Sequence, residues 1–213
     1  MKILLFGAEG KIGAVLDPAL AEAGHEVRGV GSGDDALPTG YDVAIDFTRP
    51  DAVRANVEGC LAVGIPCIVG TTGLQDADVE ALDALARERE IPCLVAPNFA
   101  LGAVLMMRFV EEAARWLPRA EIIELHDEAK VDAPSGTAKA TAARLGGDVP
   151  IHSVRLPGLV AHQEVLLGGQ GQVLTIRHDT LSREAFVPGV LLALERLGDL
   201  PAGVTLGIDG LVA

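Results

Sequence analysis

Short apolar segments alternate with helical patterns through the first hundred residues, and this alternation constrains the fold more than any other feature. Five segments have the composition of buried strands: residues 2–6, 26–30, 43–47, 67–69 and 93–96. The spacing of apolar residues between them predicts helices over residues 12–23, 52–63 and 76–87. Strands that alternate with helices are typical of a parallel sheet with crossover helices. The first part of the chain is therefore predicted to be a doubly wound α/β domain.

The pattern changes after residue 100. A long helical pattern over residues 101–116 precedes an extended stretch over 121–126 and a helix that begins near Ser135. Further strands are predicted at 154–155, 161–167 and 172–179, and the last two are joined through a glycine-rich turn, as in a hairpin. This indicates a second, smaller α+β domain with a mixed or antiparallel sheet.

The end of the chain is expected to return to the first domain. A helical pattern covers residues 186–197, and residues 204–208 have the composition of one more strand. The predicted division is a first domain of residues 1–100 with 186–213, and a second domain of residues 101–185 that binds substrate and forms subunit contacts.

Charge and composition exclude several classes of partner. The formal net charge of −13 opposes binding to nucleic acids or to anionic membrane surfaces, because both depend on clustered Lys and Arg. The apolar run at residues 3–6 is too short for a signal peptide, and no transmembrane span is predicted. The three cysteines form no CxxC pair and no dense His/Cys/carboxylate cluster is present, so we expect a cytoplasmic protein without a metal site.

Glycines follow the first predicted strand with the spacing GxxGxxG, at Gly7, Gly10 and Gly13. Glycine at such a turn lets the backbone approach a pyrophosphate, and the helix that follows supplies N–H donors and a partial positive charge. The strand and helix on either side favour a Rossmann-like dinucleotide site over a turn that serves packing alone. Lys11 adds a cation nearby.

The second strand lacks an acidic residue at its tip, where an NAD site would bind the ribose hydroxyls. Arg28 and Lys11 are candidates for a 2′-phosphate, while Asp34 and Asp35 follow a few residues later. NADH, NADPH or both therefore remain open as cofactors.

A segment from Glu124 to Ala138 combines proton-transfer groups with a candidate anion site. His126 and Lys130 flank a turn, and the predicted helix begins at Ser135-Gly136-Thr137, whose hydroxyls and N–H groups suit a carboxylate. A histidine with a pKa of about 6.5 exchanges protons at neutral pH. For any one of these residues a structural or solvated role is the simpler interpretation, so the combination carries the hypothesis.

This segment resembles the E-x-H-H-x-x-K-x-D-A-P-S-G-T-A signature of the dihydrodipicolinate reductase family. The resemblance continues in family order through the glycine turn and four further stretches: residues 45–48, 70–73, 96–99 and 177–190. It therefore covers nearly the whole chain. It implies NAD(P)H-dependent reduction of a small cyclic dicarboxylate on the route to diaminopimelate and lysine, in a cytoplasmic homotetramer.

The resemblance also implies site residues. His126 would be the general acid, assisted by Lys130. The substrate contacts would come from Asp127, Ser135, Gly136, Thr137 and Thr72. The cofactor would be lined by Gly7, Ala8, Glu9, Gly10, Lys11, Ile12, Gly70, Thr71, Thr72, Ala96, Pro97, Asn98 and Phe99.

The sequence departs from the family pattern at Asp127, where the family usually has a second histidine. A carboxylate that pointed inward would repel a dicarboxylate, so Asp127 is expected to point away or to pair with Lys130 or an arginine. The link from Ala143 to Ile151 is also short compared with the same link in long members of the family. Two alternatives remain open: a reductase of a related imino or amino acid, and a non-catalytic dinucleotide sensor.

The open face of the second-domain sheet is expected to need a cover, which a tetramer would supply. Its apolar side chains would be Val165, Leu167, Leu174 and Ile176.

Overall fold

The computed structural model describes residues 1–31 and 39–212. Asp34 and Asp35, the two acidic candidates for a ribose contact, lie outside the described residues. The chain divides into two compact units, Met1–Phe99 with Phe186–Ala213 and Ala100–Ala185.

The first unit is built on a six-stranded sheet in the order β10-β5-β4-β3-β1-β2. Every pair in it is parallel. Its strands are β1 (Lys2–Phe6), β2 (Glu26–Val30), β3 (Val43–Asp46), β4 (Cys67–Val69), β5 (Pro92–Val95) and β10 (Gly203–Leu206). The last strand of the chain pairs with β5 and so belongs to this sheet, as the sequence predicts.

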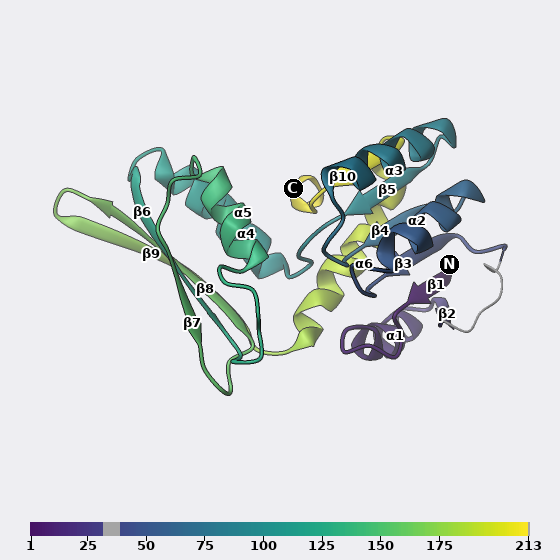
Figure 1. The fold of residues 1–213 in the computed structure, drawn as a ribbon, viewed down its shortest axis with the longest axis horizontal. Helices are drawn as coiled ribbons and strands as arrows, with labels where there is room; N and C mark the ends of the chain where they lie inside the picture. Colours follow the sequence, from purple (N-terminus) through teal and green to yellow (C-terminus); the bar gives the residue numbers. More distant parts are fainter. Residues whose placement is uncertain (32–38, 213) are drawn as a thin grey trace. The chain divides into compact units, whose positions relative to one another are not determined.

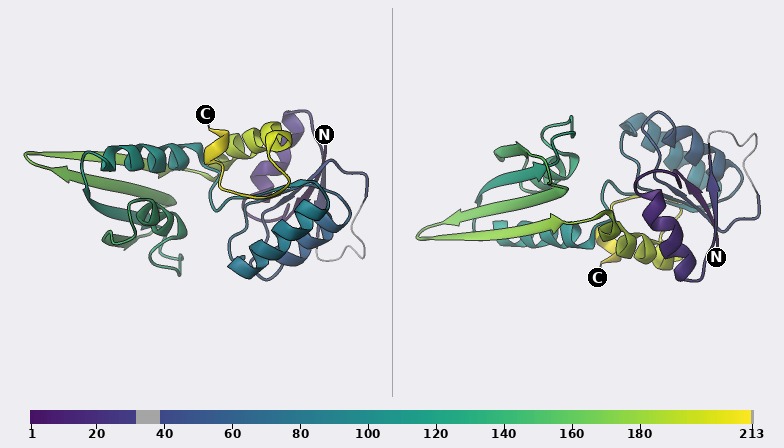
Figure 2. Two further views of the ribbon diagram at one scale, coloured as in Figure 1. Left: turned by 90° about the horizontal axis from the view of Figure 1, so that it is seen from above. Right: turned by 90° about the horizontal axis from the view of Figure 1, so that it is seen from below.

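Helices cover both faces of this sheet. They are α1 (Gly13–Glu22), α2 (Val53–Ala62), α3 (Asp76–Glu88) and α6 (Val187–Arg196), with short 3₁₀ turns at Leu197–Asp199 and Asp209–Leu211. α1 and α6 contact each other on one face, and α2 and α3 contact each other on the other (Figures 1 and 2). β3 and β4 are buried along their whole length, as expected for central strands of a parallel sheet with both faces covered. The predicted doubly wound fold is confirmed.

The order in which successive strands are added to this sheet reverses between β1 and β3, although all the strands are parallel. From β1 the strand order runs to β2 on one side and to β3, β4 and β5 on the other. The crossover connections therefore diverge at this point, and the loops after neighbouring strands leave a crevice at the carboxyl ends. Ligands of open α/β sheets bind at such switch points.

The second unit holds a four-stranded sheet in the order β7-β6-β8-β9. Its elements are α4 (Leu101–Ala114), β6 (Arg119–His126), α5 (Gly136–Arg144), β7 (Ile151–Arg155), β8 (Ala161–Gly169), β9 (Gln172–Thr180) and a 3₁₀ turn at Arg183–Phe186. β8 and β9 form the predicted hairpin, and β6 pairs with β8 in antiparallel fashion. β6 and β7, however, are parallel and are joined by a crossover through α5. Hairpins therefore do not replace every crossover, and the sheet is mixed.

One face of the second sheet is already covered within the chain. α4 contacts β8 and β9, and α5 contacts β6. Val165 and Leu167 are 0% exposed, whereas Leu174 is 40% exposed. The expectation of an open face is therefore wrong for Val165 and Leu167, which are buried. Leu174 and Ile176 lie opposite them on the edge strand β9 and share the same face, with Leu174 exposed and Ile176 half-buried.

No helix among the described residues is long and apolar enough to cross a membrane.

Candidate active site

The turn after β1 is formed by glycines that leave no room for side chains. Gly7 has a positive φ of 82°, and a Cβ there would collide with the backbone oxygen of Phe47. A Cβ on Gly13 would collide with the backbone oxygen of Gly7, and the Gly10 N–H donates to that same oxygen at 2.9 Å. The turn is therefore packed against the loop after β3 and leads directly into α1.

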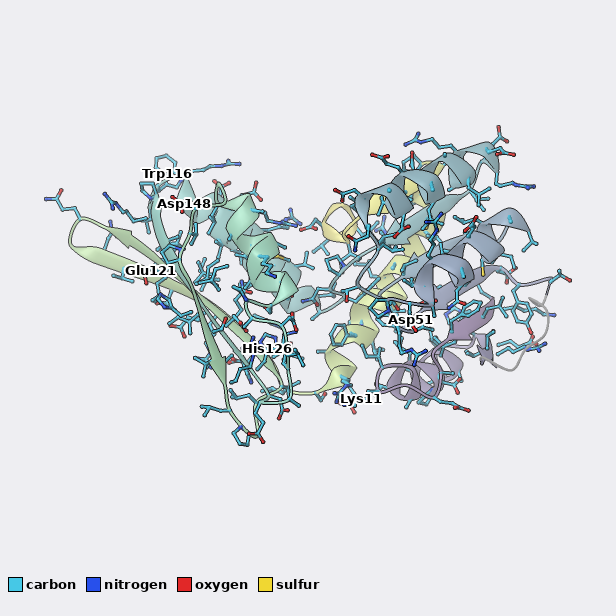
Figure 3. All side chains as sticks on the ribbon, viewed as in Figure 1. Lys11, Asp51, Trp116, Glu121, His126 and Asp148 are labelled. Atoms are coloured by element: carbon cyan, nitrogen blue, oxygen red, sulfur yellow. The ribbon has the colours of Figure 1, made fainter. Side chains whose placement is uncertain are left out.

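A cavity of about 820 Å³ lies at the carboxyl ends of β1, β2 and β3, at the switch point of the sheet. Its walls are residues 6–10, 29–31 and 47–49, together with Ala52 just before α2 and Ala55, Asn56 and Gly59 within it. Four predicted cofactor residues line it: Gly7, Ala8, Glu9 and Gly10. Lys11 and Ile12 follow in the chain but are not among its walls; Lys11 is exposed (Figure 3).

The loops after β3 and β4 are joined by one buried carboxylate. Asp46 is 2% exposed, and its Oδ1 accepts hydrogen bonds from the Thr71 hydroxyl at 2.6 Å and the Thr48 hydroxyl at 2.7 Å. Its Oδ2 accepts from the Asn56 amide at 2.8 Å. The predicted cofactor contact Thr71 therefore points its hydroxyl into the protein, where it holds the loop. Thr72, the next residue, is exposed.

The remaining predicted cofactor residues differ in how accessible they are. Ala96 and Phe99 are 1% and 0% exposed, and the Phe99 ring packs against Phe47 with 5.6 Å between centroids. A Cβ on Gly70 would collide with the Phe47 ring. These three residues therefore shape the loops from within. Pro97 is exposed and Asn98 is half-buried.

In the second unit, β6 carries Glu124 and His126 on one face because side chains two residues apart share a face of a strand. Glu124 is fully buried, and its Oε2 lies 2.5 Å from His126 Nδ1. Its Oε1 accepts from the Ser135 backbone N–H at 3.3 Å. One buried carboxylate therefore joins the histidine to the start of α5.

Arg155 neutralises this carboxylate from the neighbouring strand. Its Nη1 donates to Glu124 Oε2 at 3.0 Å and its Nη2 to Oε1 at 2.8 Å. The parallel register places Arg155 beside His126. Burial alone would raise the pKa of Glu124, but hydrogen bonds from Arg155, Ser153 and His126 outweigh it and lower that pKa. Glu124 is therefore ionised at neutral pH.

His126 retains 14% of its side-chain exposure at the end of β6 (Figure 3). Burial lowers its pKa; the Glu124 carboxylate opposes this, while the charges of Lys130 and Arg155 lower it further. Among the described residues, the only hydrogen-bond partner of its ring is Glu124, which engages Nδ1. The ring therefore presents Nε2 for proton transfer.

In the turn after His126, the side chains of Asp127 and Lys130 each have a local partner. Lys130 Nζ pairs with Asp132 Oδ1 at 2.6 Å, and this contact lowers the pKa of Asp132. Asp127 Oδ1 accepts from the Ala129 backbone N–H at 3.0 Å. Of the alternatives expected for Asp127, the contact found among the described residues is neither Lys130 nor an arginine but the backbone of the turn itself.

Ser135, Gly136 and Thr137 form the start of α5. Ser135 is 3% exposed and its hydroxyl accepts from the Ala138 N–H at 3.2 Å, which makes it the N-cap. Gly136 is exposed, with open space where a Cβ would stand. The helix start carries the partial positive charge that favours an anion. Because the Ser135 hydroxyl caps the helix, Gly136 and Thr137 are the stronger candidates for a carboxylate contact.

The sequence did not reveal what Glu124 and Arg155 do. The alternation of a strand could have placed Glu124 beside His126, since both lie in the predicted extended stretch. Arg155 could not be assigned, because its contact depends on the parallel pairing of β6 with β7. His178, another histidine in a matched stretch, lies against Gly102 of α4 and so serves packing.

Comparison with known proteins identifies the family. Residues 25–99 match the family model described as Dihydrodipicolinate reductase, N-terminus, and residues 102–210 match Dihydrodipicolinate reductase, C-terminus. The 4-hydroxy-tetrahydrodipicolinate reductase of Cutibacterium acnes is 45% identical over 243 residues, which cover 100% of this chain and 98% of that protein. The enzyme of the same name from Desulfitobacterium hafniense is 43% identical, covering 90% of this chain and 80% of that protein.

Solved structures agree. The dipicolinate-bound dihydrodipicolinate reductase of Paenisporosarcina sp. TG-14 superposes with a TM-score of 0.84 and 31% identity, covering 99% of this chain and 98% of that one. The amine dehydrogenase of Mycobacterium smegmatis has a TM-score of 0.70 at 10% identity, which shows a shared fold alone. The matches extend over both units, and the chain belongs to the dihydrodipicolinate reductase family.

Proposed function

We propose that this protein reduces 4-hydroxy-tetrahydrodipicolinate to tetrahydrodipicolinate with NADH or NADPH, in the synthesis of diaminopimelate and lysine. The names of its relatives support the reaction. The observation that carries the proposal is the Glu124 carboxylate, which contacts both His126 and the backbone of Ser135. It brings a proton donor together with a helix start that suits a substrate carboxylate.

His126 is the general acid in this proposal. Its Nδ1 is engaged by Glu124, so Nε2 gives the proton to the substrate ring. Gly136 and Thr137 hold one carboxylate at the start of α5. Lys130 supplies positive charge to the second carboxylate after exchanging its contact with Asp132, which is exposed and easily parted.

The first unit fits a nicotinamide dinucleotide. The glycine turn lines the cavity, where Gly7 and Gly10 carry no side chains, and α1 begins soon after it. When bound, NAD(P)H supplies the hydride of the reaction. Gly7 to Ile12, Gly70 to Thr72 and Ala96 to Phe99 form the loops toward it, and Asp46 holds two of the loops in place.

The family resemblance further supports a cytoplasmic homotetramer. Several apolar side chains of the second unit are exposed in the single chain, among them Trp116 at 80%, Phe109 at 57% and Val173 at 70%. Assembly into a tetramer would give such side chains a cover. Sedimentation equilibrium measures the assembly; a monomer at micromolar concentration would contradict it.

The reaction is tested by following oxidation of NADH and of NADPH by absorbance, with the condensation product of pyruvate and aspartate semialdehyde supplied by a coupled synthase. We expect rapid oxidation that depends on the synthase. No oxidation, with both nucleotides shown to bind, would direct the search to a related imine or to a non-catalytic binding role.

Replacement of the proton donor tests the site. His126→Gln should lower turnover by about 10²–10⁴-fold, the usual contribution of a general acid, with nucleotide binding retained. His152→Gln is the matched control, because His152 is exposed and pairs with Glu121 on the surface. Equal turnover in the two variants would remove His126 from the mechanism.

A further inference from the structure

We propose that Glu124, held by Arg155, is a positioning residue that keeps the His126 proton on Nδ1 and so makes Nε2 the single nitrogen that exchanges protons with substrate. The inference rests on His126 being the acid of the proposed reaction. It adds the groups that set which nitrogen of the ring reacts and when that nitrogen is charged.

Glu124 can only accept hydrogen bonds. A fully buried carboxylate bound by an arginine through two parallel hydrogen bonds stays ionised. An ionised carboxylate has no proton to give. The hydrogen between Glu124 Oε2 and His126 Nδ1 therefore belongs to the histidine.

The His126 ring keeps the same proton on Nδ1 before and after reaction. With Nδ1 protonated in both states, the neutral ring has a lone pair on Nε2 and the charged ring has a hydrogen there. Loss of the proton from Nε2 returns the neutral ring in the same tautomer, ready to take the next proton. No rotation of the ring is required within the catalytic cycle.

Arg155 fixes both the Glu124 carboxylate and the turn after β6. Besides the two contacts to Glu124, its Nη2 donates to the Asp132 backbone oxygen at 2.7 Å, and Asp132 pairs with Lys130. Arg155 therefore ties the buried carboxylate to the segment that carries the second proposed charge. A lysine at this position would keep the charge but lose the paired geometry.

The charged groups that act on His126 are few. Glu124 lies on its own strand, Lys130 on the following turn and Arg155 on β7. β8 places Ala161 opposite His126 and Gln163 opposite Glu124, and neither of these is titratable. Glu124 is therefore the one group among these that favours the charged ring, against burial and two cations.

Glu124→Gln tests the proposal, since it keeps the shape and removes the charge. The pKa of His126 should fall further, and kcat at neutral pH should drop by part of the about 10²–10⁴-fold that a general acid contributes, with little change in KM. The decline of kcat with rising pH should move to lower pH. Arg155→Lys should also lower kcat while the fold, followed by circular dichroism, is kept.

Glu121→Gln is the matched control. Glu121 lies on the same strand and also contacts a histidine, His152, at 2.8 Å, but both are exposed. The same chemical change at this position should leave the kcat profile and the His126 resonances as they are.

The decisive readout is independent of catalysis. Nitrogen-15 spectra of histidine-labelled protein report the tautomer and the pKa of each of the five histidines, and His126→Gln assigns the signal. We expect His126 of the unaltered protein to be the Nδ1–H tautomer when neutral. An Nε2–H tautomer, or an unchanged pKa in Glu124→Gln, would overturn the inference even with the reaction confirmed. An active His126→Gln variant would instead sink the proposed mechanism.

Discussion

In the glycine turn, the space available at a position determines which residue it can hold. A Cβ at Gly13 would meet the backbone of Gly7 and Ala8, whereas one at Gly210 would meet nothing within 4 Å. Backbone atoms cannot move aside as a side chain can. The requirement for glycine at Gly13 is therefore local and strict.

Gly13→Ala should displace the turn, weaken NADH and NADPH binding by at least tenfold and lower the midpoint of thermal unfolding. Overpacking of this kind costs about 1–3 kcal/mol. Titration calorimetry and a melting curve measure both effects. Gly210→Ala serves as the control, and nucleotide binding by Gly13→Ala at the control's affinity would contradict the role given to the turn.

The pH dependence of His126 belongs to the same scale. Its pKa in the free protein is lowered by burial, so it lies below the ordinary value of about 6.5. A general acid must be protonated, and kcat/KM should therefore fall as pH rises through this lowered pKa. A bound dicarboxylate favours the charged ring and raises the pKa, so kcat should decline at higher pH than kcat/KM. Coincident declines would contradict the assignment.

The lowered pKa also has a consequence for stability. Between the folded and unfolded pKa values of His126, the unfolded chain binds more protons. The free energy of unfolding should therefore decrease as pH falls through this window, by the contribution of this residue. His126→Gln should reduce that part of the slope in denaturant titrations.

At the scale of elements, two functions of α5 meet at its N-cap. Ser135 caps the helix through its hydroxyl and binds Glu124 through its backbone N–H. The sequence motif located the helix start because Ser before Gly-Thr is a cap pattern. The pairing of β6 with β7 across this helix was not predicted, since the short β7 has a polar pattern and its partner is chosen by the crossover.

Ser135→Ala should remove the cap and keep the contact to Glu124, which uses the backbone. The expected loss is about 1 kcal/mol in the free energy of unfolding, within the range of about 0.5–2 kcal/mol for N-caps. Urea unfolding measures it, with the exposed Ser182→Ala as control. A loss no larger than the control's would show that the hydroxyl does not stabilise α5.

At the scale of the whole molecule, the two units divide the chemistry. The first contains the cavity and the glycine turn, and the second contains the carboxylate, histidine and helix start. The first unit is assembled from both ends of the chain, because β10 pairs with β5. Nucleotide binding to this unit should therefore stabilise contacts made by both chain ends.

A nucleotide that binds the folded protein alone stabilises it by about 2.7 kcal/mol at one hundred times its Kd. For a chain of this size that corresponds to a rise in Tm of roughly 5–10 °C. Differential scanning calorimetry with NADH and with NADPH measures the shift and ranks the two. An unchanged Tm with both, at millimolar concentration, would contradict the proposed cofactor.

The sequence by itself determined the parallel sheet of the first unit, the order of its elements, the glycine turn and the motif around His126. These features depend on local pattern: apolar runs, helix periods, glycine spacing and a cap. The tertiary structure decided the partner of Arg155, the inward direction of the Thr71 hydroxyl, the local bond of Asp127 and the burial of Val165 and Leu167. Each of these depends on strands or loops distant in the chain, or on side-chain direction, and register and packing set both only after folding.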